Sequence, residues 1–348
     1  MVTRGSPVWL TGPTRFAMVD RPVARLWLAA MAVALVAAAA LAPEASGTTE
    51  TWFEALTAAM RHGSGYYDAL ADLLRSDPHA GAERLHPPAL VVVAAAIPGW
   101  ALTALVAAAL SALLWGATMR LASAFARSAG VIAVAAAMVV GVIAGGLLSI
   151  DAPHAGMAAI LTATALVLRR HDRWGTSCAL ACAAGVIDPA ALPAVGAFGL
   201  LALIDGTRRE AFMWLVAVLI GGIVLGAHLL AVAALGVVPG VAPGEPAVAT
   251  AASMPLVAAA LPGVPAWLAA PALLLATLGW AAWPDGLGLR VAVLMGLGTA
   301  GESLFGLHSA TLATILVASG LAFVPDALAD LLRIAVDRRR ITVTRIVR

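Results

Sequence analysis

The chain has 348 residues, of which 62% are hydrophobic and 11% are charged, and its formal net charge at pH 7 is +2. An ordinary soluble core cannot bury so much apolar surface, which excludes a soluble globular protein. The arginines stand in short clusters rather than along one basic face, so the charge pattern also argues against a nucleic-acid-binding protein.

The apolar segments of the chain are long, continuous and rich in Ala, Leu, Val and Gly. They lack the residue-by-residue alternation of polar and apolar side chains that is typical of a membrane β-barrel. Because every backbone group in lipid needs an internal partner, helices are the remaining way to cross the bilayer. We predict an all-α, polytopic membrane protein with about ten transmembrane helices and a helical extracytoplasmic first loop.

The first predicted span, at about 24–43, separates two segments of opposite charge. Residues 1–25 contain four arginines and one acid, whereas residues 44–88 contain seven acids and three arginines, a net formal charge of −4. Arginine-rich flanks stay in the cytoplasm, so residues 1–43 are predicted to be a cytoplasmic N-terminus and an outward-running span. A signal peptide is the alternative, because small residues follow the apolar run.

Residues 44–97 form the predicted extracytoplasmic acidic loop, and their pattern predicts surface helices. Thr48-Thr49-Glu50 is a capping sequence, and apolar residues recur after it at the spacing of an amphipathic helix that lies on the membrane. Gly63-Ser64-Gly65 ends this helix, and a second helix begins at Tyr66. Residues 89–97 lie between two prolines and predict either a short interfacial or re-entrant helix or the start of a long kinked one.

Residues 98–324 are predicted to form the transmembrane helical bundle. The expected spans are 98–117, 129–148, 155–168, the two arms of 176–204, 211–237, 265–283, 291–301 and 308–324. The segment 176–204 is either one long helix or two short ones. Arg173 precedes it and Arg208 follows it, so both of its ends are expected in the cytoplasm, which predicts a hairpin whose tip, Asp188-Pro189, lies near the outer face.

The last segment, 325–348, mixes apolar and charged residues and carries a basic cluster at 338–340. This pattern predicts a cytoplasmic amphipathic basic tail that lies on the anionic inner leaflet, or alternatively a plain stop-transfer anchor. Both interpretations place the C-terminus inside, on the same side as the N-terminus.

Ionisable side chains gather at the predicted outer face, and charged groups at a membrane edge point to function because burying them is costly. They are Glu50, Glu54, Asp68, Asp72, Asp77, Glu83, Asp151, His154, Asp188, Glu302 and His308. The acids of the first loop are either a solvated helix face or the source of a general base or of a ligand for a divalent metal. No motif requires a cofactor, and Cys178, Cys182 and His228 are interpreted as packing residues.

Several stretches of the chain form a pattern with a known counterpart. They are Gly65-Tyr66-Tyr67-Asp68 with Leu74-Arg75, Arg84-Leu85-His86-Pro87-Pro88-Ala89-Leu90, His154-Ala155-Gly156 to Arg169-Arg170, Ile187-Asp188-Pro189, and Thr207-Arg208-Arg209-Glu210-Ala211 with Trp214 and His228. Together with the long acidic loop and the short hairpin spans, this pattern resembles the C-fold (GT-C type) membrane glycosyltransferases and their uncharacterised bacterial relatives. The resemblance covers roughly 45–230, with weaker support from 300–335.

The resemblance implies that a sugar is transferred from a polyprenyl-phosphate donor at the outer face of a bacterial inner membrane. It also implies a carboxylate early in the first loop as general base, Glu50 or Glu54, because the acceptor hydroxyl must lose its proton as it attacks the anomeric carbon. Arg84 is expected to pair with the donor phosphate. The other substrate-binding residues that it implies are Tyr66, Tyr67, Asp68, Asp151, His154, Asp188, Glu302 and His308.

The chain departs from that family at two points. It has Asp188-Pro189 where the family places an Arg-Glu pair, and Pro153-His154 where the family places an acid followed by Trp. A noncatalytic relative is therefore one alternative, and a transporter or flippase component and a membrane assembly subunit are two others. Transporters usually carry ionisable groups near the bilayer midplane and are often built from repeats, whereas here the polar residues gather at one edge. The expected partners are membrane lipid and the lipid-linked sugar.

Overall fold

The computed structural model describes residues 7–40, 51–76, 85–170, 172–236, 264–305 and 312–336. Apart from two isolated β-bridges, these residues form helices, which confirms the predicted all-α class. Five helical runs are long and apolar enough to cross a membrane: α1 (Arg21–Ala40), α5 (Gly99–Ala122), α6 (Ser128–Asp151), α10 (Arg208–Ala234) and the run Thr314–Val336.

Further apolar helices complete the bundle, and three helices of the first loop lie between α1 and α5. The bundle adds α7 (Pro153–Leu168), α8 (Gly175–Ile187), α9 (Leu192–Ile204), α12 (Ala266–Ala282) and α13 (Gly286–Phe305), and the run at its end comprises α14 (Thr314–Val317), η5 (Ala318–Phe323) and α15 (Val324–Val336). The first loop contains α2 (Thr51–Arg61), α3 (Tyr66–Ser76) and α4 (Ala89–Ala96). Ile97 and Pro98 are not helical and separate α4 from α5, as in the short-helix interpretation of this segment.

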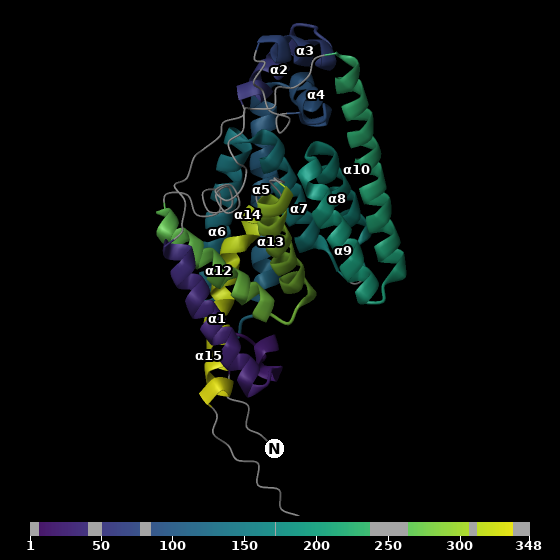
Figure 1. The fold of residues 1–348 in the computed structure, drawn as a ribbon. Coiled ribbons are helices and arrows are strands. Elements are labelled where there is room, and N and C mark those ends of the chain that lie inside the picture. Colours follow the sequence, from purple (N-terminus) through teal and green to yellow (C-terminus); the bar gives the residue numbers. More distant parts are fainter. Residues whose placement is uncertain are drawn as a thin grey trace, which may run out of the picture.

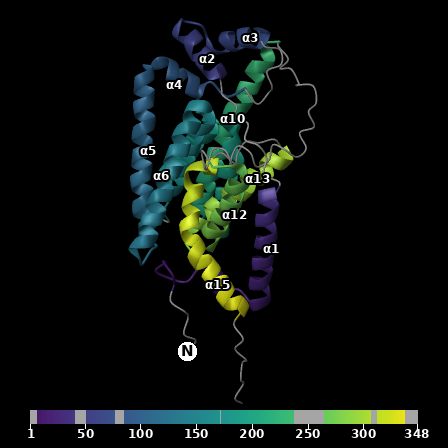
Figure 2. The ribbon, with the colours of Figure 1, turned by 90° about the vertical axis from the view of Figure 1, so that its left-hand side faces the viewer.

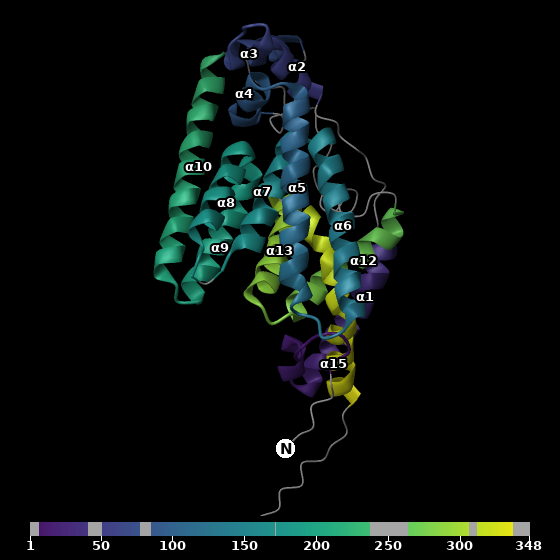
Figure 3. The same ribbon diagram turned by 180° about the vertical axis from the view of Figure 1, so that it is seen from behind.

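The helices of the first loop gather at one end of the bundle, and the N-terminal segment and α15 lie at the other (Figure 1). Seen from the side, α5 and α6 lie next to each other, the run Thr314–Val336 lies between α6 and α12, and α1 packs against α12 and α15 (Figure 2). From behind, α8, α9 and α10 lie on one flank and α1 and α12 on the other (Figure 3). The acidic loop therefore forms a cap over one end of the bundle.

The loops at the end opposite the cap are tied together by hydrogen bonds. The Thr11 N–H donates to the Ala124 carbonyl at 2.9 Å, which joins the N-terminal segment to the α5–α6 loop. Arg15 donates to the Asp285 carbonyl at 2.9 Å, and Arg120 donates to the Arg169 carbonyl at 2.8 Å. We call this the arginine-rich end, because most of the arginines of the described chain lie in its loops or at its helix ends.

The segment 176–204 forms a hairpin, as predicted, because Pro189 breaks the helix and the chain turns there. Asp188 stabilises the turn by accepting a hydrogen bond from the Ala190 N–H at 2.9 Å. Arg169 and Asp205, which flank the two arms, approach to 4.0 Å at the arginine-rich end. Each arm has 13 residues and so spans only about 20 Å. The tip is buried in the protein, with Asp188 5% exposed, and its placement near the outer face stays a prediction.

Two glycines allow α12 and η5 to pack with their backbones in direct contact. A Cβ atom on Gly320 would lie 2.1 Å from the Ala276 carbonyl oxygen, and a Cβ atom on Gly279 would collide with the Gly320 carbonyl oxygen. Small residues at helix interfaces are typical of membrane bundles, where close van der Waals contact replaces the hydrophobic effect. The last helical run is thereby held inside the bundle.

The structure differs from the sequence prediction at the C-terminal end of the bundle. A boundary was expected at residue 324, followed by a surface tail, but the run Thr314–Val336 continues through it as one helical segment. Asp326 and Asp330 are buried, because they accept hydrogen bonds from the N-terminal segment. Residues 325–336 therefore pack into the protein, and the basic cluster at 338–340 lies outside the described residues.

Candidate functional site

The cap, residues 51–76 and 85–96, has a small hydrophobic core of its own. Leu56, Leu70, Leu74 and Val91 are buried in it together with Val232 from the end of α10. The two helices were predicted, but the apolar face of α2, which was expected to lie on the membrane, packs in this core together with one face of α3. A polar contact also joins the cap to α10, because the Tyr67 hydroxyl lies 3.3 Å from Nδ1 of His228.

A stacked pair of imidazoles joins the cap to the bundle. The Tyr66 hydroxyl donates a hydrogen bond to the His86 carbonyl at 2.6 Å and so fixes the backbone of His86. The His86 ring stacks on the His154 ring with centroids 4.2 Å apart and planes 10° from parallel. Phe53 of α2 meets His154 edge-on at 5.5 Å. His154, near the start of α7, is 3% exposed, so this junction is closed to bulk water.

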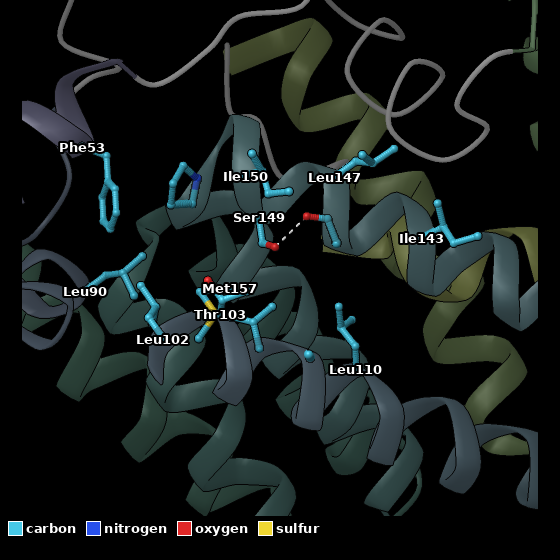
Figure 4. A pocket seen from close by; sticks show the side chains of 14 residues that line it. Phe53, Leu90, Leu102, Thr103, Leu110, Ile143, Leu147, Ser149, Ile150 and Met157 are labelled. Carbon is cyan, nitrogen blue, oxygen red and sulfur yellow. Dashed lines mark hydrogen bonds between the residues drawn. The ribbon is translucent and has the colours of Figure 1, made fainter. Parts of the chain in front are cut away.

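Below this junction, a groove of about 390 Å³ opens between α5, α6 and α7. Phe53 and Leu90 of the cap cover one side of it, and its walls include Leu102, Leu147 and Met157 (Figure 4). A ligand that fills such a groove must itself be mainly apolar, because the lining is almost entirely hydrocarbon.

Two hydroxyl groups in the groove lining are already satisfied by the backbone. The Ser149 hydroxyl donates to the Gly146 carbonyl at 2.8 Å, drawn as a dashed line in Figure 4. The Thr103 hydroxyl donates to the Gly99 carbonyl at 3.2 Å. Neither hydroxyl needs a donor or an acceptor from a ligand, so the groove suits a hydrocarbon chain rather than a sugar.

Two of the predicted carboxylates stand beside the groove. Glu54 is exposed on α2 and directly follows Phe53, which lines the groove. Asp151 is exposed at the end of α6, between the lining residues Ile150 and Pro153. Both side chains face water and neither lines the groove itself, so they are placed to act on a group that emerges from it.

The structure brings some predicted site residues together and separates others. Tyr66, Tyr67 and His154 meet at the junction of cap and bundle, whereas Asp68 is exposed on α3. Asp188 does not line the groove, and it is buried in the hairpin turn, where it accepts a hydrogen bond from the Ala190 N–H. The remaining predicted residues, Glu50, Arg84 and His308, lie outside the described residues, as does the side chain of Glu302.

Three residues of the site, Phe53, Leu90 and His86, were not predicted as site residues from the sequence. Phe53 was assigned only to the apolar face of the first predicted surface helix, and His86 and Leu90 were noted only within the family pattern. His228 was interpreted as a packing residue, and it does pack, but against Tyr67. Within the described parts of the chain, His, Cys, Asp and Glu side chains form no group of three that could hold a metal ion.

A second polar cluster lies at the arginine-rich end. Glu210, at the start of α10, is fully buried and pairs with Arg169 through two hydrogen bonds, from Nε to Oε1 at 2.6 Å and from Nη2 to Oε2 at 2.8 Å. Arg290 of α13 donates from Nη2 to Asp205 Oδ2 at 2.8 Å. These pairs tie α7, α9, α10 and α13 together at the end away from the cap.

The two tyrosines of the chain give the cap a measurable pH dependence. Burial, and secondarily the neighbouring Tyr67, raises the pKa of Tyr66, and burial also raises the pKa of Tyr67. The neutral phenol is therefore favoured by folding. This contribution to stability is complete below the free tyrosine pKa of about 10 and is lost as pH rises above it.

We expect tyrosinate absorbance in the folded protein to appear at a higher pH than in the same protein in denaturant. The chain has only Tyr66 and Tyr67, so this signal reports on the cap alone. In Tyr66→Phe the remaining signal should titrate closer to the free value, because Tyr66 is the more deeply buried of the two. Identical titrations of folded and denatured wild-type protein would show that the cap is open.

In comparisons with known proteins, no protein family, no curated protein and no solved structure matches the chain. Its class therefore rests on its own composition and helices, which are those of a helical membrane protein.

Proposed function

We propose that the chain is a membrane glycosyltransferase of the C-fold type, or a noncatalytic relative, acting at the outer face of a bacterial inner membrane. It crosses the membrane ten times, with both termini inside and the cap outside. It takes its sugar from a polyprenyl-phosphate donor whose prenyl chain lies in the groove between α5, α6 and α7.

The distribution of exposed charge supports this orientation. Exposed arginines at the arginine-rich end are Arg21, Arg25, Arg127, Arg170, Arg173, Arg208, Arg209 and Arg333. Exposed acids at the cap end are Glu54, Asp68, Asp72 and Asp151, against Arg61 and Arg75. Arginine in short loops marks the cytoplasmic side of a membrane protein, so the cap is assigned to the outside.

The observation that carries the proposal is the apolar groove under the cap. A volume of about 390 Å³ lined by hydrocarbon holds a few isoprene units, and the groove lies at the level where the cap meets the bundle. A lipid-linked donor in this groove would present its phosphate near the stacked His86 and His154 rings at the start of α7, where the helix dipole favours an anion.

The chemistry then requires a base close to the emerging phosphate. The acceptor hydroxyl attacks the anomeric carbon, the bond from that carbon to the phosphate oxygen breaks, and polyprenyl phosphate leaves with the electron pair. A carboxylate takes the proton of the hydroxyl as the new bond forms. Glu50 is the base that the family resemblance implies, and Glu54 and Asp151 are the described carboxylates beside the groove.

Turnover in proteoliposomes with a panel of radiolabelled polyprenyl-phosphate hexoses and pentoses tests this function. Glu50→Gln should lower the rate by roughly 10²- to 10⁴-fold, the usual contribution of a general base. Glu54→Gln and Asp151→Asn measured in parallel would show which carboxylate acts. Asp72→Asn is the matched control, because Asp72 is an exposed acid of the same loop whose partner is Arg75.

Each outcome separates the alternatives. A Glu50→Gln protein with full activity would reject Glu50 as the base. Wild-type protein that moves the lipid across the bilayer without cleaving its sugar would instead be a flippase. If the wild-type protein neither transfers the sugar nor moves the lipid, the noncatalytic assembly subunit is the remaining alternative.

A further inference from the structure

The two ends of α5 fit the two edges of a bilayer. Trp100, at the cap end of this helix, is 76% exposed, and an exposed tryptophan is typical of the interface between membrane and water. Arg120, at the other end, lies about 30 Å from Trp100 along the helix axis, and the hydrocarbon core of a bilayer has the same thickness. The depth of the groove can therefore be measured from Trp100.

The groove occupies only the half of the hydrocarbon core nearest the cap. Along α5 its lining begins at Leu102 and ends at Leu110, about 3 and 15 Å below the level of Trp100. In Figure 4, Phe53 lies at the cap end of the groove and Ile143 at the opposite end. The groove therefore runs from the headgroup level to about the middle of the bilayer.

The groove is also open along one side. Ile143, Leu147 and Ile150 line it from α6 and are 53%, 45% and 73% exposed, so they belong to the outer surface of the bundle as well. At this depth the bundle is surrounded by lipid tails. A lipid chain can therefore enter the groove sideways, between α5 and α6, without passing beneath the cap.

A glycine lines the groove near the end away from the cap. A Cβ atom built on Gly146 would lie 3.6 Å from Leu110 Cδ1, and, apart from its chain neighbours and its own helix backbone, it would have no other described atom within 4 Å. A larger side chain at Gly146 would therefore extend into the groove. The missing side chain leaves this end of the groove open to a ligand.

The gain in binding energy is confined to the part of a lipid chain that touches the walls. A chain that moves from the bilayer into the groove gains no hydrophobic free energy, because lipid tails are as apolar as the lining. The groove adds only van der Waals contacts, which need atoms in direct contact. Parts of the chain beyond Leu110 stay among lipid tails, so they add no affinity.

We propose that the groove recognises only the first three isoprene units next to the donor phosphate, and that Gly146 sets this length. Each unit adds four carbons to the chain, and the lining extends over about 12 Å from Leu102 to Leu110. The remaining units leave the groove at Leu110 and stay in the bilayer. This inference rests on the prenyl-phosphate donor of the proposed function, and it adds that donors of different total chain length bind equally well.

Binding without a sugar tests this length. Full-length protein in phosphatidylcholine nanodiscs is titrated with polyprenyl phosphates of two, three, four and eleven isoprene units that share one double-bond geometry. Their amounts are set as mole fractions in the disc, and bound lipid is counted by native mass spectrometry. We expect equal affinity for the phosphates of three, four and eleven units and lower affinity for that of two units, which leaves part of the groove unfilled.

Gly146→Leu shortens the groove. We expect it to bind the three longer phosphates about tenfold more weakly, because the displaced isoprene unit makes on the order of ten atom contacts with the walls. Its affinity for the two-unit phosphate should stay that of the wild type. Gly222→Leu is the matched control, since it adds the same side chain to an exposed position of α10 where a Cβ atom has no neighbour within 4 Å.

The inference is wrong if affinity rises from the four-unit to the eleven-unit phosphate, if wild-type protein binds none of the phosphates, or if folded Gly146→Leu binds like Gly222→Leu. The wild-type series needs no substitution, so it decides the question even if Gly146→Leu does not fold. The result is also separate from the test of sugar transfer. A protein that transfers no sugar can show the expected length dependence, and a transferase that contacts the whole chain would not show it.

Discussion

Replacing Glu210 with alanine is expected to lower the free energy of unfolding by about 3–5 kcal/mol, the usual cost of removing one partner from a buried ion pair. Glu210 is fully buried, and Arg169 reaches it through Nε and Nη2 at 2.6 and 2.8 Å. Without the carboxylate, the Arg169 charge stays in a site that is 9% exposed, and among the described acids only Asp205, 4.0 Å away, is left to pair with it.

The environment of Glu210 sharpens this expectation. Trp214 Nε1 also donates to Oε1 at 3.1 Å, so alanine leaves three donors without their acceptor. The Thr207 hydroxyl, 3.2 Å from Oε2, keeps the Ala202 carbonyl as its acceptor at 2.8 Å. Glu210→Gln keeps the shape and one carbonyl oxygen, and we expect it to cost less than alanine. Its amide nitrogen still faces a donor, however, which should place its stability between those of wild-type and Glu210→Ala.

Asp172→Ala is the control for this measurement. Asp172 pairs with Arg173 at 3.8 Å on the surface of the same end, where both side chains are more than 70% exposed, and such pairs contribute about 0–1 kcal/mol. Unfolding in detergent by titration with sodium dodecyl sulfate, followed by circular dichroism, compares the variants. Equal midpoints for Glu210→Ala and Asp172→Ala would show that the Arg169–Glu210 pair does not stabilise the bundle.

The order of the helices could be predicted from the sequence, because the length of each apolar segment and the positions of the arginines are local features of the chain. Arg173 and Arg208 alone predicted the hairpin of α8 and α9, and the structure confirms the turn at Asp188. The burial of that turn could not be predicted from the sequence, because it depends on which other parts of the chain cover the tip. Asp188 is buried at this turn, and the placement of the tip near the outer face stays a prediction.

The candidate site was only partly predictable for a similar reason. His154 was identified because ionisable residues gather at the predicted outer face, and Tyr66 and Tyr67 because the family resemblance implies them. The structure brings the three to one junction. The groove was not predicted, since its walls come from helices that meet only in the folded protein. Apolar positions such as Phe53 and Leu90 carry no local signal that separates a groove lining from ordinary lipid contact.

The polar contact least visible in the sequence lies between the two ends of the chain. Asp326 accepts hydrogen bonds from three successive backbone N–H groups, those of Val8, Trp9 and Leu10, at 2.5, 2.9 and 3.1 Å. The sequence predicted that this acid belongs to an amphipathic tail on the membrane surface, because apolar and charged residues are mixed there. Its partners stand more than 300 residues away.

Asp326→Ala is expected to release the N-terminal segment and to lower the free energy of unfolding by about 3 kcal/mol, because hydrogen bonds to a charged acceptor stabilise by about 1.5–3 kcal/mol each and part of that is regained from water. Hydrogen exchange checks this directly. The amides of Val8, Trp9 and Leu10 should lose their protection, while those of α5 and α6 keep theirs.

Asp20→Ala is the matched change, since Asp20 is an exposed acid just before α1 and its side chain accepts none of these bonds. The segment is also held by Asp330, which accepts bonds from the Thr14 N–H and hydroxyl at 3.0 and 2.8 Å. The release in Asp326→Ala should therefore stop near Thr14 and spread to it only when Asp330 is replaced as well. Protection of residues 8–10 that survives in Asp326→Ala would mean that the backbone hydrogen bonds of Trp9 and Thr11 to the α5–α6 loop, and not the carboxylate, hold the segment in place.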